Sequence, residues 1–267
     1  PPRPPPPPRP PPSPPSPPSP PPAPRPPPPS WCTGAGADLV VDRDRLAATV
    51  AIDFVRPDDG CLVVEGCVGG PGERRVLRFA TRIANVGCDD YHVGPAPRNA
   101  SSAAEAAAIV AATAAPGWSW HQCHKHWHYE DYARYSLRAL CDGRELAYED
   151  RPVLGRKNGW CVEDADGYAP LGDAAWLACA RKYTCEHMGI SSGCFDEYAA
   201  NLPCQWIDVT DAADGEYWLE VTANWDASTR DETTPEVSYE NNAAWVAVRI
   251  EGAAVTVLDD DEVERVC

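Results

Sequence analysis

The sequence predicts a mainly β protein: a small β-sandwich with long, disulfide-tied loops and few short helices, preceded by a disordered polyproline II segment. Three observations support this prediction. The first 30 residues hold 22 of the 31 prolines, and all twelve cysteines lie in residues 31–267. Within 31–267, several runs alternate apolar and polar residues with the period of two that is typical of strands.

Residues 1–30 are runs of proline broken by Ser, Arg and Ala, as in PPSPPSPPSPPPAP. Proline has no backbone N–H to donate to a helix or a strand ladder, so we expect an extended rod. The Ser-Pro-Pro repeats resemble the hydroxyproline-rich glycoproteins of plant and green-algal walls. A plain spacer or an SH3-type ligand is the alternative. We divide the chain into a linker or stalk (1–30) and a folded domain (31–267). Because the chain has neither an initiator Met nor a signal peptide, we expect a mature form or a fragment.

The chain carries a net charge of −17. The proline segment contributes three arginines and no acid, so residues 31–267 carry −20. Such a charge disfavours nucleic acid and anionic membranes and attracts basic partners such as lysine-rich protein. Plain solubility explains it equally well. No apolar run reaches the 18 or so residues of a membrane span.

The strand-like runs are bounded by turn signals such as Gly-Gly-Pro-Gly and Asp-Gly. They cover residues 46–55, 74–87, 124–137, 205–210, 216–225 and 243–250. Helical composition stands out only in the alanine-rich stretch Ser101–Ala115, which we expect to be a short surface helix. Just before it, Asn99 begins an N-glycosylation sequon, which suits a loop of a secreted protein.

The twelve cysteines are an even number, and none forms a C-x-x-C pair of the zinc or redox type. The proline-rich segment indicates secretion, and secreted domains use such cysteines for disulfides. We therefore expect up to six disulfides. Spacing alone does not reveal which cysteines pair.

The segment WHQCHKHWHYEDYARY, from Trp120 to Tyr135, holds four of the six histidines. On one continuous strand, His124, His126 and His128 would all point to the same face. Three imidazoles on one face predict a metal site for copper, zinc, iron or nickel. The outer two would start about 13 Å apart at about 3.3 Å per residue, so binding one ion requires strong twist or a bulge. The alternative is a surface strand with no metal.

The neighbours of these histidines have predicted roles of their own. His121 has the wrong parity for the triad, so we expect a structural or supporting role. Cys123 is better interpreted as disulfide-bonded than as a ligand. Glu130 and Asp131 could orient the imidazole N–H groups, although solvated carboxylates are the ordinary case.

The segment WSWHQCHKHWHYEDYARYSL resembles the copper-binding segment of the lysyl oxidases, quinone-containing amine oxidases that act on protein lysines. GRKNGWCVED and GCFDEYAANLPCQWIDVTD resemble further family segments, in the same order, and the resemblance covers roughly residues 33–250. It implies that His124, His126 and His128 bind copper. The spacing itself does not separate Cu(II) from a catalytic zinc. The resemblance also implies that Lys157 and Tyr198 are the precursors of lysine tyrosylquinone.

By resemblance, the domain is a secreted protein-lysine 6-oxidase. It would convert lysine ε-amines and O2 to allysine, ammonia and H2O2, and so crosslink extracellular-matrix or wall protein. Small primary amines are alternative substrates. The cycle needs a general base. The sequence leaves four candidates unranked: Asp196, Glu197, Glu163 and Asp164.

The family pattern implies the disulfides Cys61–Cys67, Cys123–Cys185, Cys194–Cys204 and Cys161–Cys179. For the cysteines left over we expect Cys88–Cys141 and Cys32–Cys267. In parts of the family, residues matching Asp38, Leu39, Glu236, Asn241 and Asn242 bind calcium, whose ligands are oxygens. Here Ser238 stands where an Asp is usual, which removes one charge.

Two other functions remain open from the sequence. One is a structural wall or matrix glycoprotein that binds copper without turnover. The other is a zinc or copper enzyme of another chemistry. Lys157 and Tyr198, both present in matching contexts, favour the oxidase, because a purely structural protein has no need of both.

Overall fold

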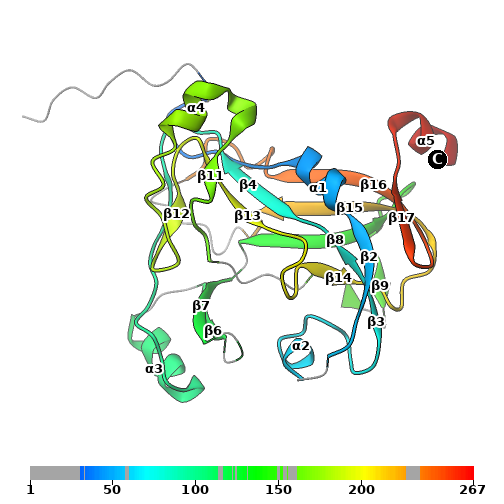
Figure 1. Ribbon diagram of the computed structural model, residues 1–267, viewed down its shortest axis with the longest axis horizontal. Helices are drawn as coiled ribbons and strands as arrows, with labels where there is room; N and C mark the ends of the chain where they lie inside the picture. Colours follow the sequence, from blue (N-terminus) through cyan, green and yellow to red (C-terminus); the bar gives the residue numbers. More distant parts are fainter. Residues whose placement is uncertain are drawn as a thin grey trace, which may run out of the picture.

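The computed structural model describes residues 31–32, 34–57, 60–113, 117–121, 123, 125–130, 132–148, 151–152, 155, 161–226 and 235–267 (Figure 1). The proline-rich residues 1–30 lie outside this part, so the division of the chain at residue 30 stays a prediction. None of the helices in the described part is long and apolar enough to cross a lipid bilayer.

The described chain is mainly β, as predicted. Its strands are β1 (Leu39–Val41), β2 (Ala51–Val55), β3 (Arg74–Arg78), β4 (Thr81–Asn85), β5 (Tyr91–Pro95), β6 (Trp118–His121), β7 (His126–Tyr129), β8 (Ala133–Ala139), β9 (Ala147–Tyr148), β10 (Arg151–Pro152), β11 (Asp166–Gly167), β12 (His187–Ile190), β13 (Cys194–Tyr198), β14 (Trp206–Asp208), β15 (Gly215–Ala223), β16 (Ala243–Glu251) and β17 (Ala254–Val257). The helices are short: α1 (Arg43–Thr49), α2 (Cys61–Val64), α3 (Ala103–Thr113), η1 (Ala169–Leu171), α4 (Asp173–Ala178) and α5 (Asp260–Val266).

Two four-stranded antiparallel sheets and one three-stranded sheet surround the core. Their strand orders are β17-β16-β15-β8, β1-β4-β13-β11 and β14-β3-β2. Alternate residues of β15 point inward, because Tyr217, Leu219, Val221 and Ala223 are buried while the residues between them are partly exposed. They join Leu39, Ile83, Leu137, Ile207 and Val246 in one continuous cluster. Figure 1 shows α3 at one end of the molecule and α5, with the C-terminus, at another.

Three expected strands are divided in the structure. The run 46–55 begins as helix α1, because the Asp42 side chain accepts the backbone N–H of Arg45 and caps the helix, which buries Leu46. The run 74–87 is interrupted between β3 and β4, and the run 124–137 between β7 and β8. The helix expected at 101–115 is confirmed as α3.

All twelve cysteines are disulfide-bonded, but the six expected pairings are wrong. Instead of Cys61–Cys67, Cys123–Cys185, Cys161–Cys179, Cys194–Cys204, Cys88–Cys141 and Cys32–Cys267, the pairs are Cys32–Cys88, Cys61–Cys123, Cys67–Cys204, Cys141–Cys267, Cys161–Cys185 and Cys179–Cys194. Tertiary packing is the reason. Helix α2 carries Cys61 toward the β6–β7 hairpin. At its other end, Cys67 lies beside β14, where the Trp206 indole donates to the Cys67 carbonyl at 2.8 Å.

We expect thiol titration of the denatured, unreduced protein to find no free thiol. A peptide map without reduction should join Cys67 to Cys204 and Cys61 to Cys123. Removing either bond should cost about 2–5 kcal/mol of unfolding free energy, because a disulfide limits the unfolded chain. A Cys61–Cys67 peptide, or several free thiols, would contradict the pairing.

Candidate functional site

The histidine segment folds as a β-hairpin. Strands β6 and β7 pair with Trp118 opposite Tyr129 and His121 opposite His126. Lys125 in the connecting turn has a φ of 55°, and its N–H donates to the His121 carbonyl. The predicted continuous strand from His124 to His128 is therefore wrong, because β7 begins only at His126. His124 and Asp131 lie outside the described residues.

Residues directly opposite each other in an antiparallel pair share a face. One face of the hairpin therefore carries Ser119, His121, His126 and His128. The argument that His121 has the wrong parity is wrong, because it assumed one strand where the chain turns back. The sequence contained a signal for the hairpin. Aromatic and polar residues alternate symmetrically in WSWH and HWHY, as they would in two strands that face each other.

The opposite face of the hairpin is aromatic and packs against α3. Trp127 is buried with Ala106 and Ile109 of α3, and Trp118 and Trp120 lie against the same cluster. The Trp127 indole donates to the Arg98 carbonyl at 3.0 Å. Helix α3 thus supports the imidazole face from behind, and Figure 1 shows α3 near the β6–β7 hairpin.

We expect Ile109→Ala to weaken this support. A buried Ile→Ala change costs about 2–5 kcal/mol, and this peripheral site should fall at the low end. Denaturant unfolding should report the loss, and metal affinity should fall with it. Ala108→Ser, at an exposed position of the same helix, is the matched control and should change stability by less than about 0.5 kcal/mol. Equal stability of the two variants would contradict the packing role.

Three imidazoles converge on the polar face. The Nε2 atoms of His126 and His128 are 2.8 Å apart. The His121 ring stacks on His128, with centroids 3.7 Å apart and an interplanar angle of 24°. His126 is exposed, whereas His128 is only 4 % exposed. The imidazole cluster is thus exposed to solvent at His126 and buried at His128.

Two carboxylates hold the His121 ring. Its Nε2 is 3.3 Å from Glu130 Oε1, and its Nδ1 is 3.4 Å from Glu65 Oε1. Burial disfavours the imidazolium, but Glu130 and Glu65 outweigh it and raise the pKa of His121. The Glu130 carboxylate also accepts the Ser119 hydroxyl. Glu130 therefore contacts an imidazole, which is not the solvated role that the sequence analysis took as the ordinary case. His121, His128 and Glu130 bring donor atoms within 4.8 Å of one another.

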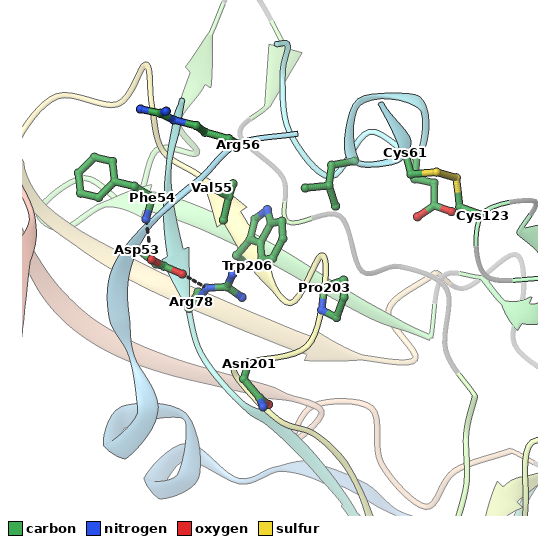
Figure 2. Close-up of a pocket in the computed structure, with 12 residues that line it drawn as sticks. Asp53, Phe54, Val55, Arg56, Cys61, Arg78, Cys123, Asn201, Pro203 and Trp206 are labelled. Atoms are coloured by element: carbon green, nitrogen blue, oxygen red, sulfur yellow. Dashed lines mark hydrogen bonds and ion pairs between the residues drawn. A yellow bond between two sulfur atoms is a disulfide. The ribbon is translucent and has the colours of Figure 1, made fainter. Parts of the chain in front are cut away.

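Glu65 follows helix α2 and also lines a groove of about 610 Å³ (Figure 2). The Cys61–Cys123 disulfide ties this helix to the hairpin turn. Asp53 and Trp206 lie on the groove wall, where the Arg78 guanidinium pairs with Asp53 at 2.6 Å and lies 4.4 Å above the Trp206 ring. The sequence analysis missed both Glu65 and the groove, because they depend on where α2 packs.

Tyr198 ends β13 with its phenol fixed by backbone. Its phenolic oxygen accepts the Cys161 N–H at 2.6 Å, and its O–H donates to the Cys161 carbonyl at 3.1 Å. Burial, reinforced by the charge of Asp196, raises the pKa of Tyr198 well above its ordinary value. Lys157 lies outside the described residues.

The described residues on both sides of Lys157 are held near this tyrosine. Gly155 donates to the Tyr135 carbonyl at 3.0 Å, and a Cβ on Gly155 would lie only 2.4 Å from that of Tyr135. Only glycine therefore fits. Tyr135 in turn lies close enough to Tyr198 to affect its pKa. On the other side, Cys161 binds the Tyr198 phenol.

The predicted calcium residues also come together. Leu39 N–H donates to Glu236 at 2.7 Å, and the side-chain amides of Asn241 and Asn242 donate to Asp38 and Glu236 at 2.9 and 3.0 Å. Calcium takes oxygen ligands, so binding would require both amides to turn their oxygens inward. Calcium binding here stays a prediction. Asn99 is exposed ahead of α3, and its glycosylation likewise stays a prediction.

The chain matches known proteins over most of its folded part. The sequence model of the lysyl oxidase family matches residues 67–259. The chain is 33% identical over 207 residues to lysyl oxidase homolog 4 of Homo sapiens, covering 72% of this chain and 23% of that protein. It is 30% identical over 202 residues to protein-lysine 6-oxidase of Rattus norvegicus, covering 72% and 41%. Lysyl oxidase homolog 4 of Bos taurus is 30% identical over 204 residues, covering 72% and 23%.

The chain thus spans less than half the length of these three relatives. The matched region includes the imidazole hairpin, the Cys161 loop and Tyr198. The chain belongs to the lysyl oxidase family.

Proposed function

We propose that this chain is a secreted copper- and lysine tyrosylquinone-dependent oxidase of protein lysines. The observation that carries the proposal is the pair of facing imidazole nitrogens, 2.8 Å apart in His126 and His128, in a chain of the lysyl oxidase family. The products would be allysine, ammonia and H2O2, and the role would be crosslinking of extracellular-matrix or wall protein.

The donor set fits a copper ion. Metal–imidazole bonds are about 2.0–2.1 Å long, so two nitrogens 2.8 Å apart can share one ion. His126 and His128 would be ligands, and His124 is proposed as the third. Imidazoles without a thiolate suit Cu(II) or a catalytic zinc, and family membership favours copper. His121 would hold the His128 ring by stacking, with Glu130 fixing its orientation.

Tyr198 and Lys157 are proposed to form the quinone. Once formed, the quinone supplies the electron sink that amine oxidation needs and that no ordinary side chain provides. The Cys161 backbone would hold the Tyr198 ring still while it is modified.

A lysine-bearing polypeptide is the proposed substrate. The acidic domain would attract basic chains. The groove brings Glu65 to its wall, and the same carboxylate contacts His121, so a lysine ammonium in the groove would be drawn toward the imidazole cluster. Six disulfides agree with an oxidising compartment.

Amine oxidation by the copper-loaded chain tests the proposal. We expect a lysine-rich polypeptide to yield H2O2 and ammonia in equal amounts, with allysine appearing in the polypeptide. We also expect a visible quinone absorption that carbonyl reagents such as phenylhydrazine abolish. Copper-loaded protein with neither quinone absorption nor peroxide would contradict it and favour a binding protein without turnover.

The proline-rich segment should be dispensable for this chemistry. Its ionisable side chains are three arginines, and its prolines cannot build a pocket. Deleting residues 1–30 should leave turnover of a free amine within about twofold while altering attachment to wall material. A large fall in turnover at unchanged copper content would show that the segment does more than tether.

A further inference from the structure

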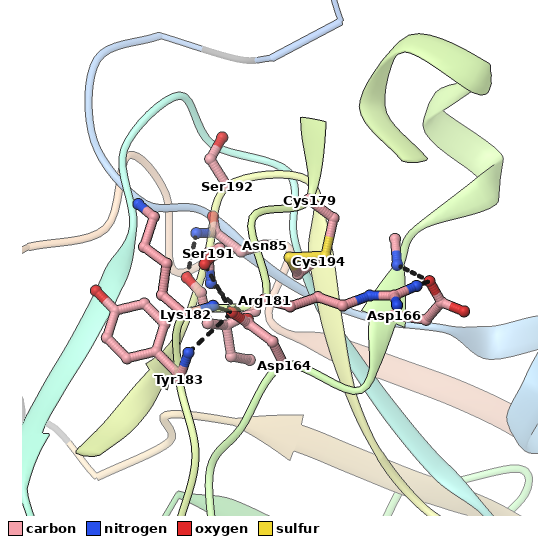
Figure 3. The surroundings of a disulfide bond; sticks show 12 residues. Asn85, Asp164, Asp166, Cys179, Arg181, Lys182, Tyr183, Ser191, Ser192 and Cys194 are labelled. Atoms are coloured by element: carbon pink, nitrogen blue, oxygen red, sulfur yellow. Dashed lines mark hydrogen bonds and ion pairs between the residues drawn. A yellow bond between two sulfur atoms is a disulfide. The ribbon is translucent and has the colours of Figure 1, made fainter. Parts of the chain in front are cut away.

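Four carboxyl groups near Lys157 or Tyr198 in sequence occupy different environments, and two of them are fully engaged. Glu197 forms ion pairs with Arg45 and Arg82, both at 2.6 Å. Asp164 accepts the backbone N–H of Lys182, Tyr183 and Ser191 and the Ser191 hydroxyl (Figure 3). These two carboxylates hold the fold together.

Asp196 is different. It lies two residues before Tyr198 on β13, so both side chains are on the same face of the strand. It is 3 % exposed. Its carboxylate receives the backbone N–H groups of Glu163 and Glu197. Its Oδ2 atom, however, is buried without a hydrogen-bond partner in the described part of the chain. A buried acceptor without a hydrogen-bond donor lowers the stability of the fold, so the presence of Asp196 at this position needs an explanation.

The groups that act on Asp196 come from several elements. Three phenols lie near enough to be affected by its charge: Tyr132 before β8, Tyr135 on β8 and Tyr198 on β13. Two carboxylates, Glu163 and Asp164, lie on the loop after Cys161. Burial, reinforced by the charge of Glu163, raises the pKa of Asp196 well above its ordinary value. Glu163 and Asp164 are both half-buried.

We propose that Asp196 is the general base of amine oxidation, with Oδ2 as the atom that takes the substrate proton. This inference rests on the proposed function. The C–H bond at the carbon bearing the amine breaks, and Oδ2 receives the proton. The quinone, when present, would be the two-electron acceptor for the electron pair of that bond and would leave the carbon at the oxidation level of an imine, while O2 would take the two electrons back from the cofactor and leave as H2O2. Hydrolysis then gives the aldehyde.

The environment of Asp196 suits this task. A general base works best when its proton affinity is matched to the working pH, and a buried carboxyl approaches that condition where an exposed one does not. The buried Oδ2 has no hydrogen-bond donor in the described part of the chain and can therefore accept a proton. The backbone N–H groups of Glu163 and Glu197 fix the carboxyl in place.

The test compares Asp196→Asn with Asp166→Asn, an exposed carboxyl on the neighbouring strand β11. Asp196→Asn should keep copper, the Lys157–Tyr198 crosslink and reaction with phenylhydrazine, but lose about 10²–10⁴ in kcat. Asp166→Asn should turn over normally. In copper-free protein, the infrared band of protonated carboxyl groups should persist well above pH 4 and lose intensity in Asp196→Asn, with burial also keeping the pKa values of Glu163 and Glu236 raised in both proteins.

A second variant separates a base from a merely structural acid. The base must be deprotonated, so activity rises as pH rises through its pKa. Glu163→Gln removes a negative neighbour, so the pKa of Asp196 should fall and the rising limb of the kcat profile should move to lower pH with its plateau kept. This profile also decides the matter if Asp196→Asn does not fold or form the crosslink.

The outcomes distinguish the two proposals. If wild-type protein does not react with phenylhydrazine, the proposed function fails. If wild-type protein reacts and turns over but Asp196→Asn retains more than a tenth of kcat, or Glu163→Gln leaves the limb in place, only the role of Asp196 is overturned.

Discussion

Replacing His126 by alanine is expected to abolish stoichiometric copper binding. The substitution removes one of the two facing Nε2 atoms. Loss of a group that only orients a ligand costs about 10- to 100-fold in affinity, so loss of a ligand should cost more than about 100-fold. Elemental analysis after dialysis against a chelator should find about one copper per wild-type chain and almost none in the variant.

His187→Ala is the control for this experiment. His187 lies on β12 and packs edge-on against His92, with ring centroids 5.1 Å apart, in a cluster that includes Tyr183. Its removal should leave copper content unchanged. His121→Ala should weaken binding by only about 10- to 100-fold if that ring supports His128. Equal copper content in His126→Ala and His187→Ala would contradict the proposed site.

Lys157→Arg and Tyr198→Phe are each expected to eliminate amine oxidation while keeping the fold and the copper. A guanidinium stays protonated and cannot act as the nucleophile that the lysine amine provides. Phenylalanine lacks the phenol that must be oxidised. Tyr198→Phe also leaves the N–H and carbonyl of Cys161 without their phenol partner, so it should cost about 1–3 kcal/mol of stability as well.

Copper content, thermal melting and peroxide release would be measured on both variants together with Lys182→Arg. Lys182 is an exposed lysine that pairs with Asp90 at 2.6 Å, and its replacement should leave activity unchanged. Turnover by Lys157→Arg comparable to that of Lys182→Arg would show that Lys157 is not part of the cofactor.

The sequence was sufficient to predict the fold class because alternation along strands such as β15 is a local property. The pairing of Cys61 and Cys67 was not predictable in this way. These cysteines lie only six residues apart, yet each bonds to a distant partner because α2 packs between the hairpin and β14. That arrangement depends on tertiary contacts, which leave no mark in local spacing.

In the candidate site, too, features set by local sequence patterns were predictable, whereas features set by tertiary contacts were not. His126 and His128 were found from their spacing, and Tyr198 from the family resemblance. His121 was given the wrong face because a turn reverses the chain between His121 and His126. Glu65 was missed because it reaches the site from another element.

The general base could not be chosen from the sequence for a related reason. Alternation along β13 places Asp196 and Glu197 on opposite faces, but it does not say which face is buried. The elements packed on each face decide this: α1 and β4 supply Arg45 and Arg82 to Glu197, whereas the phenols of Tyr132, Tyr135 and Tyr198 lie near enough to Asp196 to be affected by its charge.

A tryptic map of the copper-loaded, reduced protein tests the central claim most directly. The account predicts that the peptides containing Lys157 and Tyr198 elute as one crosslinked species, with the mass of a tyrosine oxidised to the quinone level. Copper-free protein should give the two peptides separately. If active, copper-loaded protein also yields the two peptides separate and unmodified, the quinone mechanism is wrong for this chain.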